Sequence, residues 1–294
     1  MSIFLTGSSG FVGTSVLNYF GSDSIIHYKR GDVIKIDSAT TVIHLAGKAH
    51  DLKKTTNSDE YYQVNTVLTQ NVFDAFLASD AKVFIMLSSV KAVADELEEE
   101  LIEGHHPSPV THYGKSKLMA EQYILSKPRP ANKKIYVLRP CMIYGLGNKG
   151  NLNLLYKIVS KNIPWPLAAF ENQRSFCSID NLMFIFKELI EREDIPSGVY
   201  NIADDEPLST NELISLMGQS QKRKPKLWKI SKELIEALAS LGNKLHLPLN
   251  TERLQKLTSS YVVSNAKIKL AIGKSLPVSS RDGFLKTFKS FNNQ

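Results

Sequence analysis

Tyr113 and Lys117 are the residues whose types and spacing point most directly to chemistry. They stand four positions apart in YGKSKLMAEQYILS (113–126), a helical pattern, so both side chains would lie on one helix face. An ammonium group beside a phenol stabilises the phenolate and lowers the pKa of the tyrosine, which makes it a usable acid and base. Ser89 closes an apolar run 24 residues before Tyr113 and would hydrogen-bond the same substrate oxygen. The three residues together predict an acid–base centre built around Tyr113.

A glycine-rich segment, TGSSGFVG (6–13), lies between the first apolar run and the first helical pattern. Gly7, Gly10 and Gly13 are spaced by three, and glycine permits a tight turn, a close approach of the backbone to a pyrophosphate, and close packing of helix on strand. The N-terminus of the following helix would add N–H donors and a partial positive charge. Directly after an N-terminal strand, this segment predicts a dinucleotide-binding loop, although its spacing differs from GxGxxG.

The residues after the second apolar run indicate which dinucleotide binds. An acid there would bind the ribose 2′-hydroxyl of NAD, whereas a cation suits the 2′-phosphate of NADP. SIIHYK (24–29) ends in Lys29, Arg30 follows, and the first acids come later at Asp32 and Asp37. We therefore expect NAD(P) as the cofactor with a preference for NADP(H). Asp37, at the end of an expected third strand, would be placed to hold the adenine amino group.

Short apolar runs alternate with helical patterns along the first half of the chain. Continuous apolar strands between helices predict a parallel sheet covered on both faces, which is an α/β, Rossmann-type doubly wound fold. The expected strands are residues 2–7, 24–29, 32–37, 40–47, 82–89 and 134–140, and the expected helices are 11–20, 60–79 and 113–126.

The pattern weakens after Gly145, where Pro, Asn and Lys become more frequent. Helices such as 209–219 and 231–242 are scattered through this part, which indicates a smaller second lobe. We expect a dinucleotide-binding domain over 1–145 plus about 176–203, and a C-terminal substrate-binding lobe over 146–175 plus 204–294.

The composition limits the class of protein. With 294 residues, 43% of them hydrophobic and 22% charged, the chain has an ordinary globular composition. Its two cysteines, Cys141 and Cys177, are far apart, which excludes a cysteine metal knuckle and favours a reducing compartment. The N-terminus does not read as a signal peptide, and no stretch approaches ~20 continuous apolar residues. We expect a cytoplasmic protein with no membrane span and no metal site.

The net charge of +7 is concentrated toward the C-terminus. Residues 221–274 carry twelve Lys or Arg and three Asp or Glu, a balance that could attract nucleic acid, an anionic membrane surface or a polyanionic small molecule. No nucleic-acid-binding motif accompanies these residues, and aromatic interleaving does not go beyond Trp228. We expect no nucleic-acid partner and interpret most of these lysines as a solvated basic face.

The order of several motifs resembles the extended short-chain dehydrogenase/reductase family, in its NAD-dependent epimerase/dehydratase group. The motifs span nearly the whole chain: TGSSGFVG (6–13), VIHLAG (42–47), Asn65, LSSVKAV (87–93), YGKSK (113–117), LRPCMIYG (138–145), RSFCSIDN (174–181), GVYNIADDEPLST (198–210) and RDGFLKTF (281–288). The resemblance implies a Rossmann domain for the dinucleotide and a C-terminal lobe for a sugar nucleotide, expected to be a UDP-sugar. It also implies a homodimer formed through the helices at 60–79 and 113–126.

The same resemblance implies roles for individual residues. Tyr113 would be the acid and base, Lys117 would bind the nicotinamide ribose and tune Tyr113, and Ser89 would orient the substrate. With the residues already discussed, the expected dinucleotide contacts are Gly7, Ser9, Gly10, Phe11, Val12, Gly13, Lys29, Arg30, Asp37, Leu45, Ala46, Gly47, Asn65, Tyr113, Lys117 and Pro140. The expected substrate contacts are Ser89, Lys91, Tyr113, Asn151, Leu152, Arg174 and Arg253. The two arginines would bind the diphosphate, for which a guanidinium offers bidentate hydrogen bonds.

Members of this family share hydride exchange at the sugar C4 position, and the residues after Ser89 limit the later steps of the reaction. The family's 4,6-dehydratases carry Asp-Glu there and its decarboxylases carry Glu, whereas this chain has Val90 and Lys91. Both reactions therefore lack their catalytic groups. Relatives that act as dinucleotide-sensing regulators or RNA-binding scaffolds usually lack the Tyr or the Lys, and this chain has both.

Two reactions remain, a 4-keto reductase that uses exchangeable NADPH and a 4-epimerase that keeps NAD tightly bound. Lys29-Arg30, the lack of a helix between the second and third strands, and the SSVK motif (88–91) favour the reductase. SSVK and ENQRSFCSIDNL (171–182) are similar to reductases of UDP-4-keto-6-deoxy-N-acetylhexosamines for surface polysaccharides, so we expect such a substrate. The alternative is a UDP-glucose or UDP-N-acetylglucosamine 4-epimerase.

Overall fold

The chain folds into two units, and the first of them holds the expected sheet. The computed structural model describes residues 1–29, 31–49, 58–148, 151–245 and 250–291. The first unit comprises Met1–Cys141, Ile179–Ala203 and Ser264–Pro277. Its strands are β1 (Ile3–Thr6), β2 (Ile25–Tyr28), β3 (Thr41–His44), β4 (Val83–Leu87), β5 (Lys134–Pro140) and β8 (Gly198–Ile202). Its helices and single turns are α1 (Phe11–Phe20), η1 (Ser22–Ser24), α2 (Asp59–Tyr62), η2 (Gln63–Val67), α3 (Leu68–Ala78), η3 (Val90–Ala92), α4 (His112–Ser126), α6 (Ile179–Glu191) and α10 (Ala266–Ile272).

These six strands form one sheet in the order β2-β1-β3-β4-β5-β8, and every neighbouring pair is parallel. The inner strands are runs of buried residues, such as IFLT in β1 and VFIML in β4, because a strand covered on both faces needs no polar alternation. Thr6 at the end of β1 lies in register with Tyr28 and His44, so three loops leave the sheet from one edge. The strand order reverses between β1 and β3, which is where sheets of this kind bind ligands. The predicted α/β, Rossmann-type doubly wound fold is confirmed.

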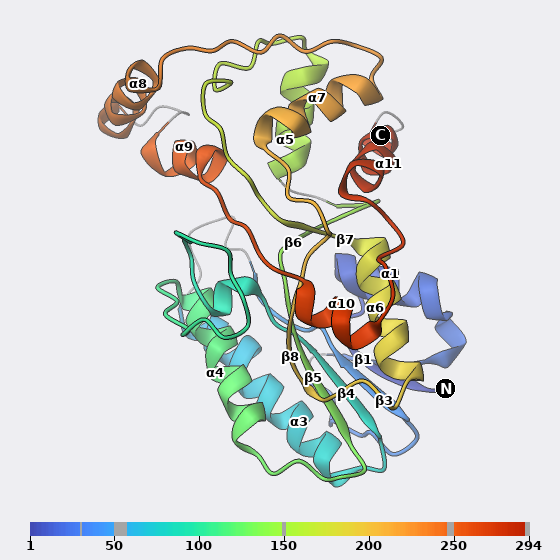
Figure 1. The fold of residues 1–294 in the computed structure, drawn as a ribbon. Coiled ribbons are helices and arrows are strands. Elements are labelled where there is room, and N and C mark those ends of the chain that lie inside the picture. Colours follow the sequence, from blue (N-terminus) through green and yellow to red (C-terminus); the bar gives the residue numbers. More distant parts are fainter. Residues whose placement is uncertain (30, 50–57, 149–150, 246–249, 292–294) are drawn as a thin grey trace. The chain divides into compact units, whose positions relative to one another are not determined.

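Helices cover both faces of this sheet. α3 and α4 pack together on one face, and α1 and α6 lie on the other (Figure 1). On the α3 side, the rings of Phe73, Phe76 and Phe84 lie with their centroids 4.9 to 6.0 Å apart. Ala120 and Ile124 of α4 are buried in the same cluster. Burial of these apolar side chains anchors α4 to the sheet, so residues carried on α4 have a rigid support.

The strand expected at residues 32–37 does not form. The Lys29 N–H donates to the Asp32 carboxylate at 3.2 Å and the Asp32 N–H donates to the Lys29 carbonyl at 3.0 Å, which closes a turn directly after β2. Gly31 adopts the φ of +95° that this turn requires. Val33 is 76% exposed, and Ile36 is buried. The alternating apolar residues of this segment therefore bury the Ile36 side chain and do not form one face of a strand. β2 is an edge strand of the sheet.

The helix expected at 60–79 is divided by a wider turn. α2 runs into the π-helical turn η2, and α3 continues from it. Such turns widen the helix by one residue and are frequent at functional sites. Asn65 and Thr66, both within η2, are buried. The periodicity predicted the helix correctly but gave no sign of the wider turn.

The second unit comprises Met142–Ser178, Asp204–Val263 and Val278–Gln294. Its elements are the parallel pair β6 (Met142–Tyr144) and β7 (Phe176–Ser178), with helices α5 (Asn151–Ser160), α7 (Thr210–Ser220), α8 (Lys232–Leu245), α9 (Thr251–Thr258) and α11 (Ser280–Phe291). The Tyr144 ring stacks on Phe284 with centroids 3.7 Å apart, and its hydroxyl donates to the Asp204 carboxylate at 2.8 Å. A Cβ on Gly283 would lie 2.5 Å from that hydroxyl, so the glycine of the RDGF motif is required for packing. In the described part of the chain, no helix has both the length and the apolar composition needed to cross a membrane.

The division between the units differs from the predicted one, which assigned all of 204–294 to the second lobe. Ser264–Pro277 belongs to the first unit because α10 packs beside β8. Lys267 donates to the carbonyl of Val199 at 2.7 Å, and Ile268 is fully buried. The sequence could not show this return, because the segment is short and its partner strand lies more than 60 residues earlier.

Candidate active site

The loop after β1 holds the three glycines predicted to bind a dinucleotide. Gly7 has a φ of +74°, and a Cβ on it would lie 2.8 Å from the Ala46 nitrogen and 2.9 Å from the Leu45 carbonyl carbon. The loop therefore passes directly against the segment after β3. A Cβ on Gly13 would lie 2.2 Å from the Gly7 oxygen. Gly10 caps α1 with no side-chain hydrogen bond, so the N–H groups of the first helical turn are available to an anion.

Side chains at Gly7 and Gly13 would overlap the backbone of the loop or of the segment after β3, so the compact turn that a dinucleotide-binding loop requires depends on both glycines. Of the other predicted contacts, Ser9, Phe11 and Val12 lie in the loop or the first turn of α1, and Pro140 ends β5. A Cβ on Gly47 would lie 3.0 Å from the Lys117 ammonium nitrogen and 3.2 Å from the Asn65 amide oxygen. The predicted contacts in this unit therefore follow the carboxyl ends of β1, β3 and β5.

Gly13→Ala is expected to weaken dinucleotide binding about 10- to 100-fold, because its methyl group would overlap the Gly7 carbonyl and overpacking of this kind costs ~1–3 kcal/mol. Calorimetric titration with NAD(H) and NADP(H) measures the dissociation constants. Gly198→Ala is the control, since the nearest atom to its Cβ would be 3.9 Å away. Equal dissociation constants for the two variants would show that the loop is not part of the dinucleotide-binding site.

Ser89, Tyr113 and Lys117 come together beside the carboxyl end of β4. Ser89 follows β4 and caps η3, where its hydroxyl accepts the Lys91 N–H at 3.2 Å. Tyr113, half-buried in the first turn of α4, shares a side-chain hydrogen bond with Ser89. Lys117, one turn later, is buried and donates to the Leu87 carbonyl at 2.9 Å. The three residues predicted from the sequence thus form one cluster.

The electrostatics of this cluster differ from the sequence-based expectation. Burial raises the pKa of Tyr113, the hydrogen bond with Ser89 opposes that rise, and the charge of Glu121 adds to it. Burial lowers the pKa of Lys117 to about 8, while Glu121 raises it. The expected net lowering of the Tyr113 pKa is therefore wrong for this structure, because desolvation is the largest effect. Burial therefore favours the protonated phenol of Tyr113.

Asn65 ties the segment after β3 to α4. Its amide oxygen accepts the Lys48 N–H at 2.7 Å, and its amide nitrogen donates to the Lys48 carbonyl at 3.0 Å. The same nitrogen donates to the Ser116 hydroxyl at 2.9 Å, and Ser116 donates to the Tyr113 carbonyl at 2.8 Å. The wider turn at η2 thus places Asn65 where it links the backbone of Lys48 to the Ser116 side chain, next to Lys117 on α4.

A buried ion pair below Lys117 was not found from the sequence. Arg139 on β5 donates to both carboxylate oxygens of Glu121, at 2.6 to 3.1 Å, and the two side chains are 6% and 1% exposed. The Ser88 hydroxyl also donates to Glu121. Glu121 stands four residues after Lys117 on the same helix face, which places this ion pair next to Lys117.

His44 is a buried, fully hydrogen-bonded residue of β3. Its Nδ1 lies 2.8 Å from the Thr6 hydroxyl and its Nε2 lies 2.9 Å from the Thr69 hydroxyl. Burial and the nearby Lys117 charge lower the pKa of His44 to about 3, so the ring is neutral at physiological pH. The Thr6 hydroxyl also accepts the Ala46 N–H at 3.1 Å. The neutral His44 ring therefore supports the segment after β3 through Thr6 and does not act as an acid there.

The end of β2 carries an acid as well as a cation. Lys29 is exposed, and its backbone N–H is bound by the Asp32 carboxylate. Asp37 is exposed in a turn and does not end a strand, which corrects its predicted position. Arg30 lies outside the described residues. A carboxylate at this point favours a ribose 2′-hydroxyl and weakens the expectation of NADP.

Two predicted substrate residues make contacts that the sequence did not suggest. The Lys91 ammonium donates to the Asp95 carbonyl within its own loop, at 2.5 Å. Leu152 is 3% exposed in the core of the second unit, so its side chain is not available to a nucleotide. The hydrophobic side chain of Leu152 was the signal for burial.

The remaining substrate residues lie in the second unit. Arg174 is half-buried, and its guanidinium donates to the Lys256 carbonyl at 2.6 Å. Arg253 is exposed in the first turn of α9, where its N–H donates to Asn250 at 2.9 Å. Asn151 begins α5, and its side chain is outside the described part of the structure.

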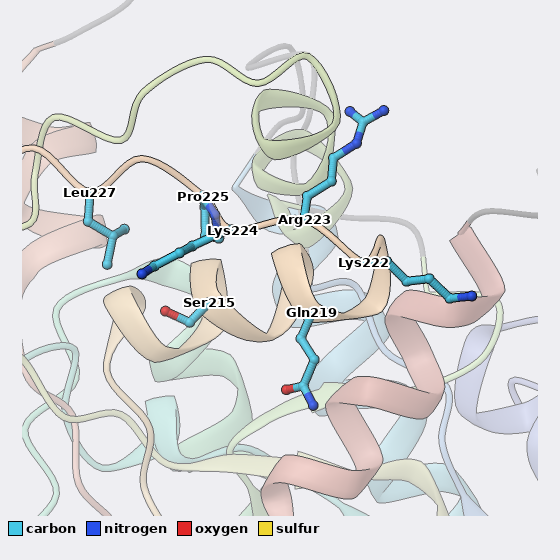
Figure 2. Close-up of a pocket in the computed structure, with 7 residues that line it drawn as sticks. All are labelled: Ser215, Gln219, Lys222, Arg223, Lys224, Pro225 and Leu227. Carbon is cyan, nitrogen blue, oxygen red and sulfur yellow. The ribbon is translucent and has the colours of Figure 1, made fainter.

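An open groove also occurs in the second unit, between α7 and the segment after it. Ser215 and Gln219 line one side, and Lys222, Arg223 and Lys224 belong to the other (Figure 2). None of the predicted cofactor or substrate residues lines this groove. Among the residues that the structure describes, no cluster of three or more His, Cys, Asp or Glu could hold a metal ion.

Comparison with known proteins gives four findings. The model of the NAD dependent epimerase/dehydratase family matches residues 3–203. The chain is 27% identical to the UDP-glucose 4-epimerase of Vibrio cholerae, over 99% of this chain and 95% of the relative. It is 30% identical to N-acetyl-alpha-D-glucosaminyl-diphospho-ditrans,octacis-undecaprenol 4-epimerase of Escherichia coli O157:H7, over 76% of this chain and 73% of the relative. The fold is similar to that of UDP-glucuronic acid 4-epimerase from Bacillus cereus, solved in complex with NAD, with a TM-score of 0.75, 18% identity and coverage of 100% and 99%.

Proposed function

Because the chain belongs to the NAD dependent epimerase/dehydratase family, we propose that it exchanges hydride at C4 of a hexose carried on a diphosphate and acts as a 4-epimerase. The observation that carries this proposal is the cluster of Ser89, Tyr113 and Lys117, beside the carboxyl end of β4 and in the unit that holds the glycine loop. Such a cluster can move a proton at a sugar hydroxyl while a dinucleotide binds along the same edge of the sheet.

The chemistry of each residue follows from its surroundings. A bound nicotinamide dinucleotide supplies the acceptor and donor of the hydride. Tyr113 must lose its own proton before the first step. As a tyrosinate it takes the proton of the C4 hydroxyl when hydride leaves C4, and as a phenol it gives that proton back when hydride returns to the opposite face of the ketone. Lys117, whose pKa is about 8, supplies an ammonium that stabilises the tyrosinate before the first step and after the second. Ser89 holds the Tyr113 hydroxyl and orients the sugar oxygen.

Two features support the epimerase. Both relatives named above are 4-epimerases of sugars on a diphosphate, one on uridine and one on undecaprenol. Asp32 at the end of β2 suits NAD, the cofactor that a 4-epimerase retains. Val90 and Lys91, which stand where the family's dehydratases carry acids, exclude dehydration and do not distinguish the epimerase from the reductase. The diphosphate is the part of the substrate shared by both carriers, and Arg174 is the residue we assign to it.

A 4-keto reductase is the second candidate, acting on a UDP-linked 6-deoxy-N-acetylhexosamine with NADPH. Lys29 is exposed at the end of β2, where a cation would attract a 2′-phosphate. The described residues between β2 and β3 contain no helix, and the SSVK motif is present.

Cofactor release and turnover distinguish the two reactions. We expect purified, denatured protein to release NAD, and the native protein to interconvert UDP-glucose with UDP-galactose, or their N-acetylated forms, with no added cofactor. Mass spectrometry of the supernatant and chromatography of the products measure this. Protein that arrives without dinucleotide and oxidises NADPH only with a 4-keto sugar nucleotide would be the reductase. Absence of both activities with dinucleotide still bound would refute the C4 reaction.

A further inference from the structure

Four leucines form an exposed stripe along α8, outside every site described above. They recur at i, i+4, i+7 and i+11, which places them on one helix face, and they are 47% to 59% exposed: Leu234, Leu238, Leu241 and Leu245. The adjoining face of the helix packs into the second unit, where Ile235 and Ala239 are buried in the core. α8 therefore contacts its own unit through one apolar face and presents a second one to solvent.

Such a stripe is unusual for a protein surface. Single exposed apolar residues are common, and Leu154 and Leu270 are examples elsewhere in this chain, with 63% and 86% exposure. A contiguous apolar stripe beside polar residues marks a surface that binds a partner or a membrane. The identity of the partner depends on the charge around it.

The segment from the end of α7 to the first residue of α8 is strongly basic. It carries six exposed cations and no acid, and none of the six has an ion-pair partner among the described residues: Lys222, Arg223, Lys224, Lys226, Lys229 and Lys232. Figure 2 shows the Lys222 and Arg223 side chains extending away from α7. Trp228, in the same segment, is 55% exposed. Cations beside an exposed aromatic and a leucine-lined helix are the features of a helix that lies in a membrane interface.

We propose that α8 docks on an anionic phospholipid bilayer, with its leucines between the acyl chains and the basic segment on the lipid phosphates. A bilayer of this charge complements the six cations, each of which gains attraction near an anionic surface. A second copy of the chain would bring the same basic segment and a net charge of +7 against itself, which opposes self-association at this face. Docking through α8 does not depend on the proposed C4 reaction.

Vesicle flotation tests the docking with the full chain. We expect the protein to float with vesicles of phosphatidylcholine and phosphatidylglycerol and to stay unbound with phosphatidylcholine alone. Raising the salt from about 0.1 M to about 1 M shortens the screening length from about 10 to about 3 Å and should release most of the bound protein. No binding to the anionic vesicles, or equal binding to both kinds, would overturn the proposal.

A pair of matched variants tests the leucines themselves. Leu238→Ser/Leu241→Ser should weaken partition onto anionic vesicles at least ~10-fold, because two side chains no longer enter the acyl layer. Leu154→Ser/Leu270→Ser removes two exposed leucines outside the stripe and should bind as the natural chain does. Both variants should keep the far-UV circular dichroism and any C4 activity on a soluble substrate. Equal vesicle binding by the two variants, or a smaller oligomer on gel filtration for the stripe variant alone, would contradict the membrane as the partner.

Discussion

Replacing Tyr113 with Phe is expected to lower turnover at C4 by at least ~10², the scale of a lost general acid and base, with the fold intact. The change removes only the hydroxyl that is hydrogen-bonded with Ser89, and the ring keeps its half-buried position on α4. The turnover number at saturating sugar nucleotide measures the loss. Dinucleotide dissociation constants, determined in parallel, should be unchanged.

Tyr123→Phe is the matched control, because Tyr123 lies on the same helix and its hydroxyl donates to Asp74 at 2.7 to 2.8 Å. This variant loses a hydrogen bond of similar kind far from Ser89 and should turn over at nearly the normal rate. Near-normal activity of Tyr113→Phe, or an equal loss in both variants, would show that the proton is handled elsewhere.

Glu121→Gln is expected to lower the free energy of unfolding by ~3–5 kcal/mol, since it leaves the buried Arg139 guanidinium without a counter-ion. That is a large share of the ~5–15 kcal/mol that usually holds a folded protein together. Urea unfolding followed by far-UV circular dichroism measures the change. The double variant Glu121→Gln/Arg139→Met removes both charges and should recover most of the loss.

Glu252→Gln is the control for this prediction. Glu252 pairs with Lys256 at 2.6 Å, but both side chains are 66% exposed, so breaking the pair should change stability far less. A loss for Glu121→Gln no larger than that of Glu252→Gln would mean that water reaches Arg139 in the folded chain.

The parts of the fold predicted correctly are those in which local pattern and burial agree. The strands at β1, β3, β4 and β5 are continuous apolar runs, and α4 has a helical pattern with Tyr113 and Lys117 on one face. The strand predicted at residues 32–37 was wrong because alternating apolar residues in so short a run do not distinguish a strand from a loop that buries Ile36 alone. The homodimer stays a prediction.

The parts of the site that could not be predicted depend on contacts between distant residues. Arg139 and Glu121 are 18 residues apart, and nothing in the sequence requires that they meet. The direction of the Tyr113 pKa shift depends on how deeply α4 packs, which no spacing reveals. The turn after β2 brings the Asp32 carboxylate next to the backbone of Lys29, which adds a negative charge there. A turn closed by a single carboxylate cannot be recognised from composition.

The interleaving of the two units has a consequence for how the chain is made. The polypeptide passes from one unit to the other after residues 141, 178, 203, 263 and 277. At ~5–20 residues per second, the ribosome therefore exposes β1 to β5 many seconds before α10, the last piece of that unit, has been synthesised. The second unit waits longer still, for Phe284 and Phe288 of α11. A premature stop before residue 264 would leave both units unfinished, and a stop within α11 would leave the second unit unfinished. A chaperone that holds the early strands would have to remain bound until most of the chain has been translated.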